Sequence, residues 1–203
     1  MLTRKMLAVG LSELAQGDQD LAAVVDRHGP PPLWSRKPGF PTVVQIILEQ
    51  QVSLASAKAA FGKLKNTLSE VTPSGLLGLD DGELKTIGFS RQKARYCREL
   101  SRAIVEGRFD IESLSQLADA DAKEALMSQV GIGRWTADIY LLMALRRPDI
   151  WPKGDLALAK AAQQVKNLGE LPDQDRLEEM ARSWRPWRAV AARVLWHHYL
   201  SSD

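Results

Sequence analysis

The sequence predicts an all-α protein, and two observations carry this prediction. Apolar side chains recur every three to four residues along most of the 203-residue chain, which is the spacing of one helix face. No segment alternates apolar and polar residues over a length that would require a sheet strand. We therefore expect about ten helices joined by turns and short loops.

Capping residues, glycines and prolines place the ends of the expected helices. Asp80 and Gly88 are expected to cap and stop one of the shorter ones. In chain order we expect a helix over residues 11–25 that Gly29 stops, one or two helices over 40–68, short pieces over 72–90, a helix over 91–107 that Ser90 opens, a helix from Asp121 to Gly131, another from there to Arg146, a helix over 154–169, and a last helix that begins at Pro186.

Composition bounds the class of protein. With 45% hydrophobic and 26% charged residues, residues 1–203 fit one globular domain, and no apolar run approaches the ~18 residues of a membrane span. We expect a cytoplasmic protein, nucleoid-associated if bacterial. The single cysteine, Cys97, excludes an internal disulfide and is expected to be a buried thiol. His28, His197 and His198 do not form a convincing metal set. A net charge of +2 means that any nucleic-acid affinity must come from a local patch.

The stretch GIGRWTAD, residues 131–138, interrupts a helical pattern with two glycines. One interpretation is a helix stop followed by a tight turn, in which glycine supplies a positive φ. The other is a phosphate-binding turn, because a new helix N-terminus presents backbone N–H groups and glycine lets a large anion approach. Arg134 and Lys123 would then add positive charge. The glycines alone leave both interpretations open.

The segment LMSQVGIGRWTADIYLLMAL resembles the hairpin of the helix-hairpin-helix DNA glycosylases, most closely the 3-methyladenine DNA glycosylase II branch. Val130 stands where the family usually has proline before the first glycine. Residues 39–61 are similar to the family's pocket and wedge segment, 87–104 to its middle helix pair, and 184–196 to its C-terminal helix.

This resemblance implies an architecture for the whole chain. It predicts a two-lobed helical bundle with a helix-hairpin-helix motif and a cleft between the lobes. Residues 30–120 would approximate the pocket and wedge lobe, while residues 1–29 and 121–203 would form the hairpin and catalytic lobe. The larger members carry an additional N-terminal α/β domain, so the resemblance implies a minimal form.

In this family an essential aspartate follows the hairpin across a loop, and Asp155 occupies that place in the sequence. An aspartate before an Ala-rich helix is typically an N-cap, and the two roles are compatible because a positive helix end keeps a carboxylate ionised. An anion there would stabilise the oxocarbenium character that C1′ gains as a base leaves, and would orient the attacking water. Asp149 precedes the loop instead of opening the helix. Asp138 is expected to be a solvated or structural acid.

Relatives that also nick the DNA strand carry a lysine just past the hairpin, where this chain has Trp135. The resemblance therefore implies base release without strand scission. Lys153 lies close to Asp155 and could be mistaken for the lysine that forms a Schiff base. A loop lysine beside DNA is more often a phosphate contact, and we expect that role.

Further roles follow residue by residue from the resemblance. Gln51 is the expected wedge that fills the gap left by a flipped base, and Gln50 would be a neighbouring structural amide. The aromatic candidates for the base pocket are Trp196, Phe40, Trp135 and Tyr140, whose faces suit electron-poor alkylated purines. The expected phosphate contacts of the hairpin region are Gly131, Ile132, Gly133, Arg134 and Lys153. No cofactor is required, and the carbonyl oxygens of Met127, Gln129 and Ile132 are expected to bind a structural Na⁺ or K⁺.

The sequence thus predicts a monomeric base-excision repair glycosylase that flips and releases alkylated purines, of the 3-methyladenine and 7-methylguanine type, from damaged double-stranded DNA. Two alternatives stay open. One is a glycosylase of another specificity, for uracil or an oxidised purine. The other is a non-catalytic helix-hairpin-helix module that binds damaged DNA, in which Asp155 is only an N-cap.

Overall fold

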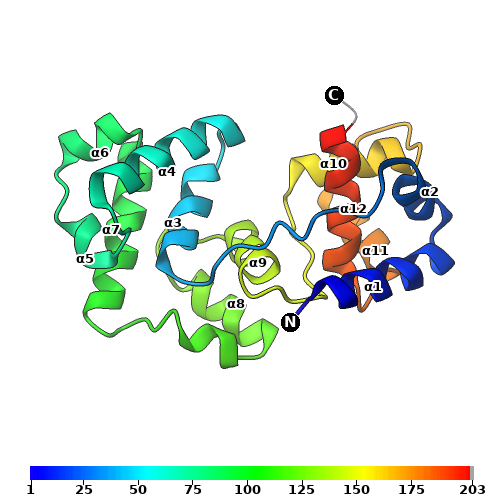
Figure 1. Ribbon diagram of the computed structural model, residues 1–203, viewed down its shortest axis with the longest axis horizontal. Helices are drawn as coiled ribbons and strands as arrows, with labels where there is room; N and C mark the ends of the chain where they lie inside the picture. The colour runs from blue at the N-terminus through cyan, green and yellow to red at the C-terminus, as the bar shows by residue number, and fades with distance from the viewer. Residues whose placement is uncertain (202–203) are drawn as a thin grey trace. The chain divides into compact units, whose positions relative to one another are not determined.

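The computed structural model describes residues 1–201, and within them the regular secondary structure is helical throughout, with no strand (Figure 1). This confirms the all-α prediction. The elements are α1 Arg4–Gly17, α2 Gln19–His28, α3 Phe40–Glu49, α4 Leu54–Leu68, α5 Pro73–Leu77, α6 Asp81–Ile87, α7 Arg91–Val105, the 3₁₀ helix η1 Ser113–Gln116, α8 Asp119–Met127, α9 Arg134–Met143, α10 Leu156–Val165, α11 Gln174–Arg182 and α12 Arg188–Ser201. Among residues 1–201, no helix is long and apolar enough to span a membrane.

The chain divides into two compact units. Residues 36–140 form one of them, and residues 1–35 together with the chain from Leu141 onward form the other. The expected lobes differ from this division in two respects. Residues 30–35 belong with the unit built from both ends of the chain, and residues 121–140, which carry the hairpin, belong with the segment 36–120. In consequence, the hairpin and the expected wedge lie in one unit, and Asp155 lies in the other.

The unit built from both ends of the chain packs around α12. Its residues from Ala189 to Trp196 are all buried, and all of them except Arg193 are apolar, as is typical of a helix that is covered on every side. It contacts α1, α2, α10 and α11. The exception to its apolar surface is Arg193, which is fully buried and donates to the carbonyl oxygens of Leu33, Leu142 and Ala189 at 3.0, 2.9 and 2.8 Å. Burial lowers the pKa of Arg193 to about 10.

The unit of residues 36–140 contains α3 to α8 and most of α9. Helix α3 supplies much of its core, because six of its apolar side chains and Thr42 are buried. The expected caps are confirmed here: Asp80 forms a capping box with Glu83, Gly88 ends α6 in a left-handed conformation, and Ser90 accepts from the N–H of Lys93 to open α7. Cys97 is a buried free thiol, as expected, and burial raises its pKa.

Several predicted helix ends were wrong. The helix expected over 11–25 is two helices, because Asp18 leaves the helical conformation and caps α2 through the N–H of Leu21. Asp121 lies inside the first turn of α8 and does not begin it. The last helix starts at Arg188, two residues after Pro186, and the hairpin helices α8 and α9 end earlier than expected. Helix α11 was not predicted.

Candidate active site

The two hairpin glycines have different surroundings. Gly131 has φ +84°, and a Cβ atom added to it would overlap the ring of Tyr96, so both the backbone conformation and the packing require glycine. Gly133 has no positive φ, is exposed, and would have no atom within 4 Å of an added Cβ. The turn interpretation therefore accounts for Gly131 alone, and it leaves open space at Gly133.

Gly133 lies directly before α9. Its carbonyl oxygen accepts the N–H of Ala137 at 3.0 Å, which is the first hydrogen bond of that helix. The positive end of the helix dipole thus lies at an exposed residue without a side chain, with Arg134 exposed beside it. Such an arrangement can receive a phosphate group through backbone N–H groups. The neighbouring Ile132 is buried and anchors the turn.

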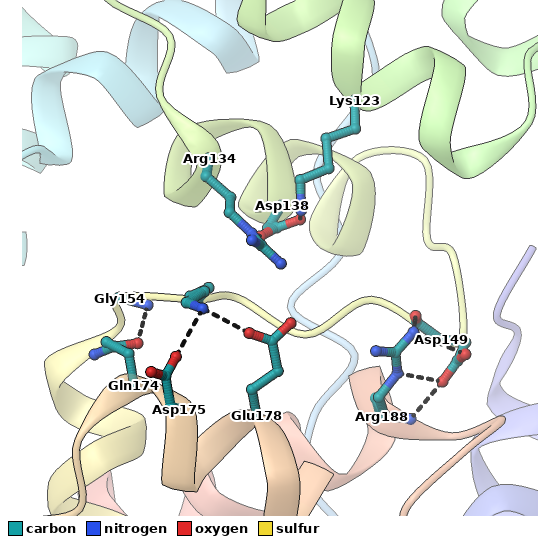
Figure 2. A network of polar contacts seen from close by, with 10 residues as sticks. Lys123, Arg134, Asp138, Asp149, Gly154, Gln174, Asp175, Glu178 and Arg188 are labelled. Carbon is teal, nitrogen blue, oxygen red and sulfur yellow. Dashed lines mark hydrogen bonds and ion pairs between the residues drawn. The ribbon is translucent and has the colours of Figure 1, made fainter. Parts of the chain in front are cut away.

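Asp138 of α9 is a buried acid, so of its two expected roles, solvated or structural, the structure supports the structural one. Only 1% of its side chain is exposed. Lys123 of α8 pairs with one of its carboxylate oxygens, and Arg134 lies 3.9 Å from the other, as Figure 2 shows. Because Lys123 neutralises a buried carboxylate, its main role is to join the two hairpin helices rather than to contact phosphate.

The expected wedge, Gln51, is exposed and has φ +56°, which is rare for a residue with a side chain. The three residues before it are each held by a polar contact. Lys93 donates to the carbonyl oxygen of Leu48 at 2.7 Å, and Arg36 forms a two-bond pair with Glu49 at 3.0 and 2.9 Å. The end of α3 is therefore fixed before the chain turns outward at Gln51.

The third of these contacts joins α3 to the hairpin. The side-chain amide of Gln50 donates to the carbonyl oxygen of Gly131 at 3.0 Å and to the hydroxyl of Thr136 at 2.9 Å. Thr136 is buried in the first turn of α9. Gln50 is thus the structural amide that the sequence predicts, and it ties the residue before the wedge to the turn that contains both glycines.

Asp155 is the N-cap of α10. Its Oδ1 accepts the N–H of Leu158 at 2.9 Å and the indole N–H of Trp196 at 3.2 Å. The side chain is half-buried. The two donors hold this carboxylate in a fixed direction at the positive end of the helix.

Trp196 belongs to α12 and is 8% exposed. Its ring meets the ring of Trp34 edge to face, with centroids 6.5 Å apart. Trp34 has φ +44° and follows the proline stretch. Sequence reasoning missed Trp34, because no local pattern shows that it reaches Trp196. The one available signal was its position shortly after three consecutive prolines, which marked it as a candidate aromatic residue.

The other aromatic candidates lie in the unit of residues 36–140. Phe40, at the start of α3, is buried, and the hydroxyl of Tyr140 accepts the N–H of the preceding Gly39 at 2.9 Å. The structure therefore brings Phe40 and Tyr140 to the same place. Burial raises the pKa of Tyr140, so its hydroxyl stays protonated at neutral pH. Trp135 is half-buried in the first turn of α9.

Lys153 and Asp149 flank the loop that leads to Asp155, and both side chains are engaged. Lys153 pairs with Glu178 and Asp175 of α11 at 2.6 and 3.3 Å. Asp149 forms a two-bond pair with Arg188 at 2.8 and 2.9 Å, which makes it a structural acid (Figure 2). Of the acids near this loop, Asp155 remains the candidate for catalysis.

A comparison with known families identifies the fold. The model of the HhH-GPD superfamily of base excision DNA repair proteins matches residues 44–187, which include the α3 end, the hairpin and Asp155.

The chain belongs to the HhH-GPD superfamily.

Three similar proteins are named 3-methyladenine DNA glycosylases or glycosidases. YfjP of Bacillus subtilis, assigned as a DNA-3-methyladenine glycosylase, is 30% identical over 184 residues, which cover 87% of this chain and 64% of its own length. A 3-methyladenine DNA glycosylase of Schizosaccharomyces pombe, solved in complex with abasic DNA, matches with a TM-score of 0.82 at 25% identity over 94% of each chain. The structure of a DNA-3-methyladenine glycosidase from Bacillus halodurans has a TM-score of 0.78 at 25% identity and covers 96% of this chain and 91% of that chain.

The expected cation site in this HhH-GPD hairpin consists of backbone oxygens. Met127 ends α8, where the last carbonyl groups of a helix lack helical partners, and the carbonyl oxygen of Gln129 accepts the N–H of Ile132 at 3.1 Å. A carbonyl oxygen has two lone pairs, so this bond leaves room for a second contact. Neutral oxygen donors suit Na⁺ or K⁺, and the cation at Met127, Gln129 and Ile132 stays a prediction.

Proposed function

We propose that this chain is a monofunctional DNA glycosylase that flips alkylated purines, of the 3-methyladenine and 7-methylguanine type, out of duplex DNA and releases them by hydrolysis in base excision repair. One observation carries the proposal: Asp155 is the N-cap of α10 in a chain whose residues 44–187 match the HhH-GPD superfamily. The names of the similar proteins support the alkylated purine as substrate. Because the proposed substrate is DNA, we expect the protein to act at the chromosome.

The catalytic step follows from the state of Asp155. As the N-glycosidic bond breaks, positive charge develops at C1′ of the deoxyribose, and a fixed carboxylate nearby stabilises it. The N–H groups of Leu158 and Trp196 orient Oδ1, so little reorganisation is needed during the reaction. The same carboxylate can accept a proton from the attacking water.

Recognition of the base rests on aromatic faces. An alkylated purine such as 3-methyladenine or 7-methylguanine carries positive charge on its ring, and indole and phenol faces attract cations. Within the unit that holds Asp155, we assign this role to Trp196 and Trp34. Phe40, Tyr140 and Trp135 are separate candidates within residues 36–140. A base must leave the stack before it can be cleaved, and the exposed Gln51 would fill the space that it leaves.

Two features support hydrolysis without strand scission. Trp135 lies in the first turn of α9, where relatives that nick DNA carry a lysine. The hydrogen bonds that Lys153 donates to Glu178 and Asp175 raise its pKa. A lysine nucleophile must be neutral, so a raised pKa opposes Schiff-base formation by Lys153.

The test is base release from methylated duplex DNA by the wild type and by the Asp155→Asn variant. Asparagine also caps helices well, so the variant should fold and bind DNA. We expect the wild type to release alkylated purines, the variant to be slower by about a hundredfold or more, and strands to break only after alkali treatment.

Asp173→Asn provides a matched control. Asp173 is the N-cap of α11 and accepts the N–H of Arg176 at 2.8 Å. It therefore caps its helix through the same kind of hydrogen bond as the one between Asp155 and Leu158. This control should release bases at the wild-type rate. If the wild type binds damaged DNA but releases no alkylated, deaminated or oxidised base, the proposal is wrong and the chain is a DNA-binding module.

A further inference from the structure

The loop of residues 151–155 is held by contacts at consecutive residues. Lys153 Nζ lies 2.6 Å from Glu178 and 3.3 Å from Asp175. The N–H of Gly154 donates to the side-chain oxygen of Gln174 at 2.6 Å, as Figure 2 shows. All three partners lie within the first five residues of α11. This helix therefore contacts the loop both at a side chain and at the backbone.

The loop is fixed at its other end as well. The ring of Trp151 is buried against Trp184, which follows α11, with centroids 5.4 Å apart. Gly154 has φ +91°, and the N–H of Asp155 approaches the carbonyl oxygen of Pro152 at 3.4 Å to close a tight turn. The direction of the Asp155 carboxylate therefore depends on a turn whose middle is held by α11.

We propose that Lys153 is a positioning residue that, with Glu178, clamps this loop and sets the direction of Asp155, and that it is not a phosphate contact. The inference rests on the proposed catalytic role of Asp155. Glu178 is the principal partner, because its distance is shorter and its side chain is 33% exposed, compared with 94% for Asp175. An ion pair as exposed as that with Asp175 contributes little.

The local charge supports the clamp. The Lys153 ammonium lies beside two carboxylates, so its positive charge is already compensated and attracts a phosphate group only weakly. A phosphate would have to displace Glu178 from Lys153 and would leave that carboxylate beside the DNA backbone. A shift of Asp155 by as little as 1 Å can slow a reaction by about a hundredfold, so a small loosening of the loop has a large effect on rate.

The experiment compares Lys153→Met, Glu178→Gln and the double variant in single-turnover base release, and measures binding to an abasic duplex at several salt concentrations. Glu179→Gln is the matched control, because Glu179 is the next residue of α11 and pairs with the exposed Arg182 instead.

For a clamp we expect both single variants to release bases about ten- to a hundredfold more slowly, with the double variant no slower than either. The dependence of binding on salt should be unchanged, and Lys153→Arg should restore most of the rate. A phosphate contact would instead lower the salt slope by about one in Lys153→Met and would leave Glu178→Gln at full rate. That outcome, or wild-type rates in both single variants, would overturn the proposal.

A second readout does not depend on catalysis. Amide hydrogen exchange at Gly154 should be faster in Lys153→Met and in Glu178→Gln than in the wild type or in Glu179→Gln. Unchanged exchange at Gly154 would refute the clamp even if the enzyme is active. Faster exchange in a protein that releases no base would support the clamp and refute only the proposed function.

Discussion

Gly131 and Gly133 lie two residues apart in one turn, yet the structure places different demands on them. Gly131 meets the Tyr96 ring and has a positive φ, whereas Gly133 is exposed and unobstructed. The two glycines therefore separate the folding of the hairpin from its proposed contact with DNA.

This difference predicts opposite results for two alanine variants. Gly131→Ala should lose roughly 2–5 kcal/mol of stability, because the new methyl group overlaps Tyr96 and alanine is strained at this φ. The free energy of unfolding of Gly133→Ala should differ from that of the wild type by no more than about 0.5 kcal/mol. This variant should nevertheless bind an abasic duplex more weakly. Thermal unfolding and DNA titration measure the two effects. Wild-type DNA affinity in Gly133→Ala would rule out a phosphate contact at that residue.

Gln51 combines a left-handed backbone with an exposed side chain, so its conformation is set by its neighbours rather than by its own preference. Replacement by glycine and by alanine separates the two properties. Both variants remove the wedge, and both should release bases more slowly. The glycine variant should be more stable than the alanine variant by about 1 kcal/mol, because only alanine pays for the positive φ. Equal stabilities in denaturant unfolding would show that the backbone at Gln51 is not strained.

At the end of α3, the side chain of Gln50 joins this helix to the hairpin by contacting Gly131 and Thr136. This contact connects the end of α3, which leads to the proposed wedge, with the hairpin, which carries the proposed phosphate site.

The Gln50→Leu variant tests this link. It keeps the side-chain volume but leaves the buried hydroxyl of Thr136 and the Gly131 carbonyl without their donor, which should cost about 1–3 kcal/mol of stability. We also expect base release to slow by about tenfold or more, with Gln50→Glu only partly restoring it. Single-turnover kinetics and chemical unfolding provide the measurements. A variant that is less stable but releases bases at the wild-type rate would limit Gln50 to a structural role.

At the scale of the elements, several ends marked by a capping residue or a glycine were predicted correctly, but a side-chain cap alone was not sufficient for Asp18 or Asp173. Asp80, Gly88, Ser90 and Asp155 act as expected, because each forms its own cap. The start of α8 was misplaced because its N-cap, Ala118, makes no side-chain hydrogen bond. The break before α2 was missed although Asp18 is a good N-cap, because apolar periodicity continues across it.

Contacts between distant residues were outside the reach of local patterns. The sequence shows Lys153 beside Asp155, but its pairing with Glu178 depends on α11 folding back onto the loop. The same holds for Trp34 against Trp196 and for the burial of Asp138. The resemblance supplied the candidate residues, while the structure shows what holds each of them in place.

For the whole molecule, a cluster of histidines links stability to pH. His28 of α2 lies 6.0 Å from His197 and 5.6 Å from His198 of α12, measured between ring centroids. Burial, together with His28 and Arg27, lowers the pKa of His198 below its usual 6.5. The unfolded chain therefore takes up a proton at His198 before the folded protein does, and the free energy of unfolding must fall as pH drops through about 6.5.

We expect the thermal midpoint to be lower at pH 5.5 than at pH 7.5, and the difference to be smaller in the His198→Gln variant. Calorimetry at both pH values provides the comparison, since other titrating groups contribute equally to wild type and variant. An equal pH dependence in the two proteins would exclude His198 as a source of it.

The division of the chain also determines the order in which its parts can fold during synthesis. Residues 36–140 form a complete unit as soon as Tyr140 has left the ribosome. Helices α1 and α2 leave the ribosome before this unit, but their partner α12 is made after it, and the Leu33 carbonyl must wait for Arg193. Residues 1–35 are thus translated before the unit of residues 36–140 but buried after it, and they stay open to chaperones and proteases until α12 has been made.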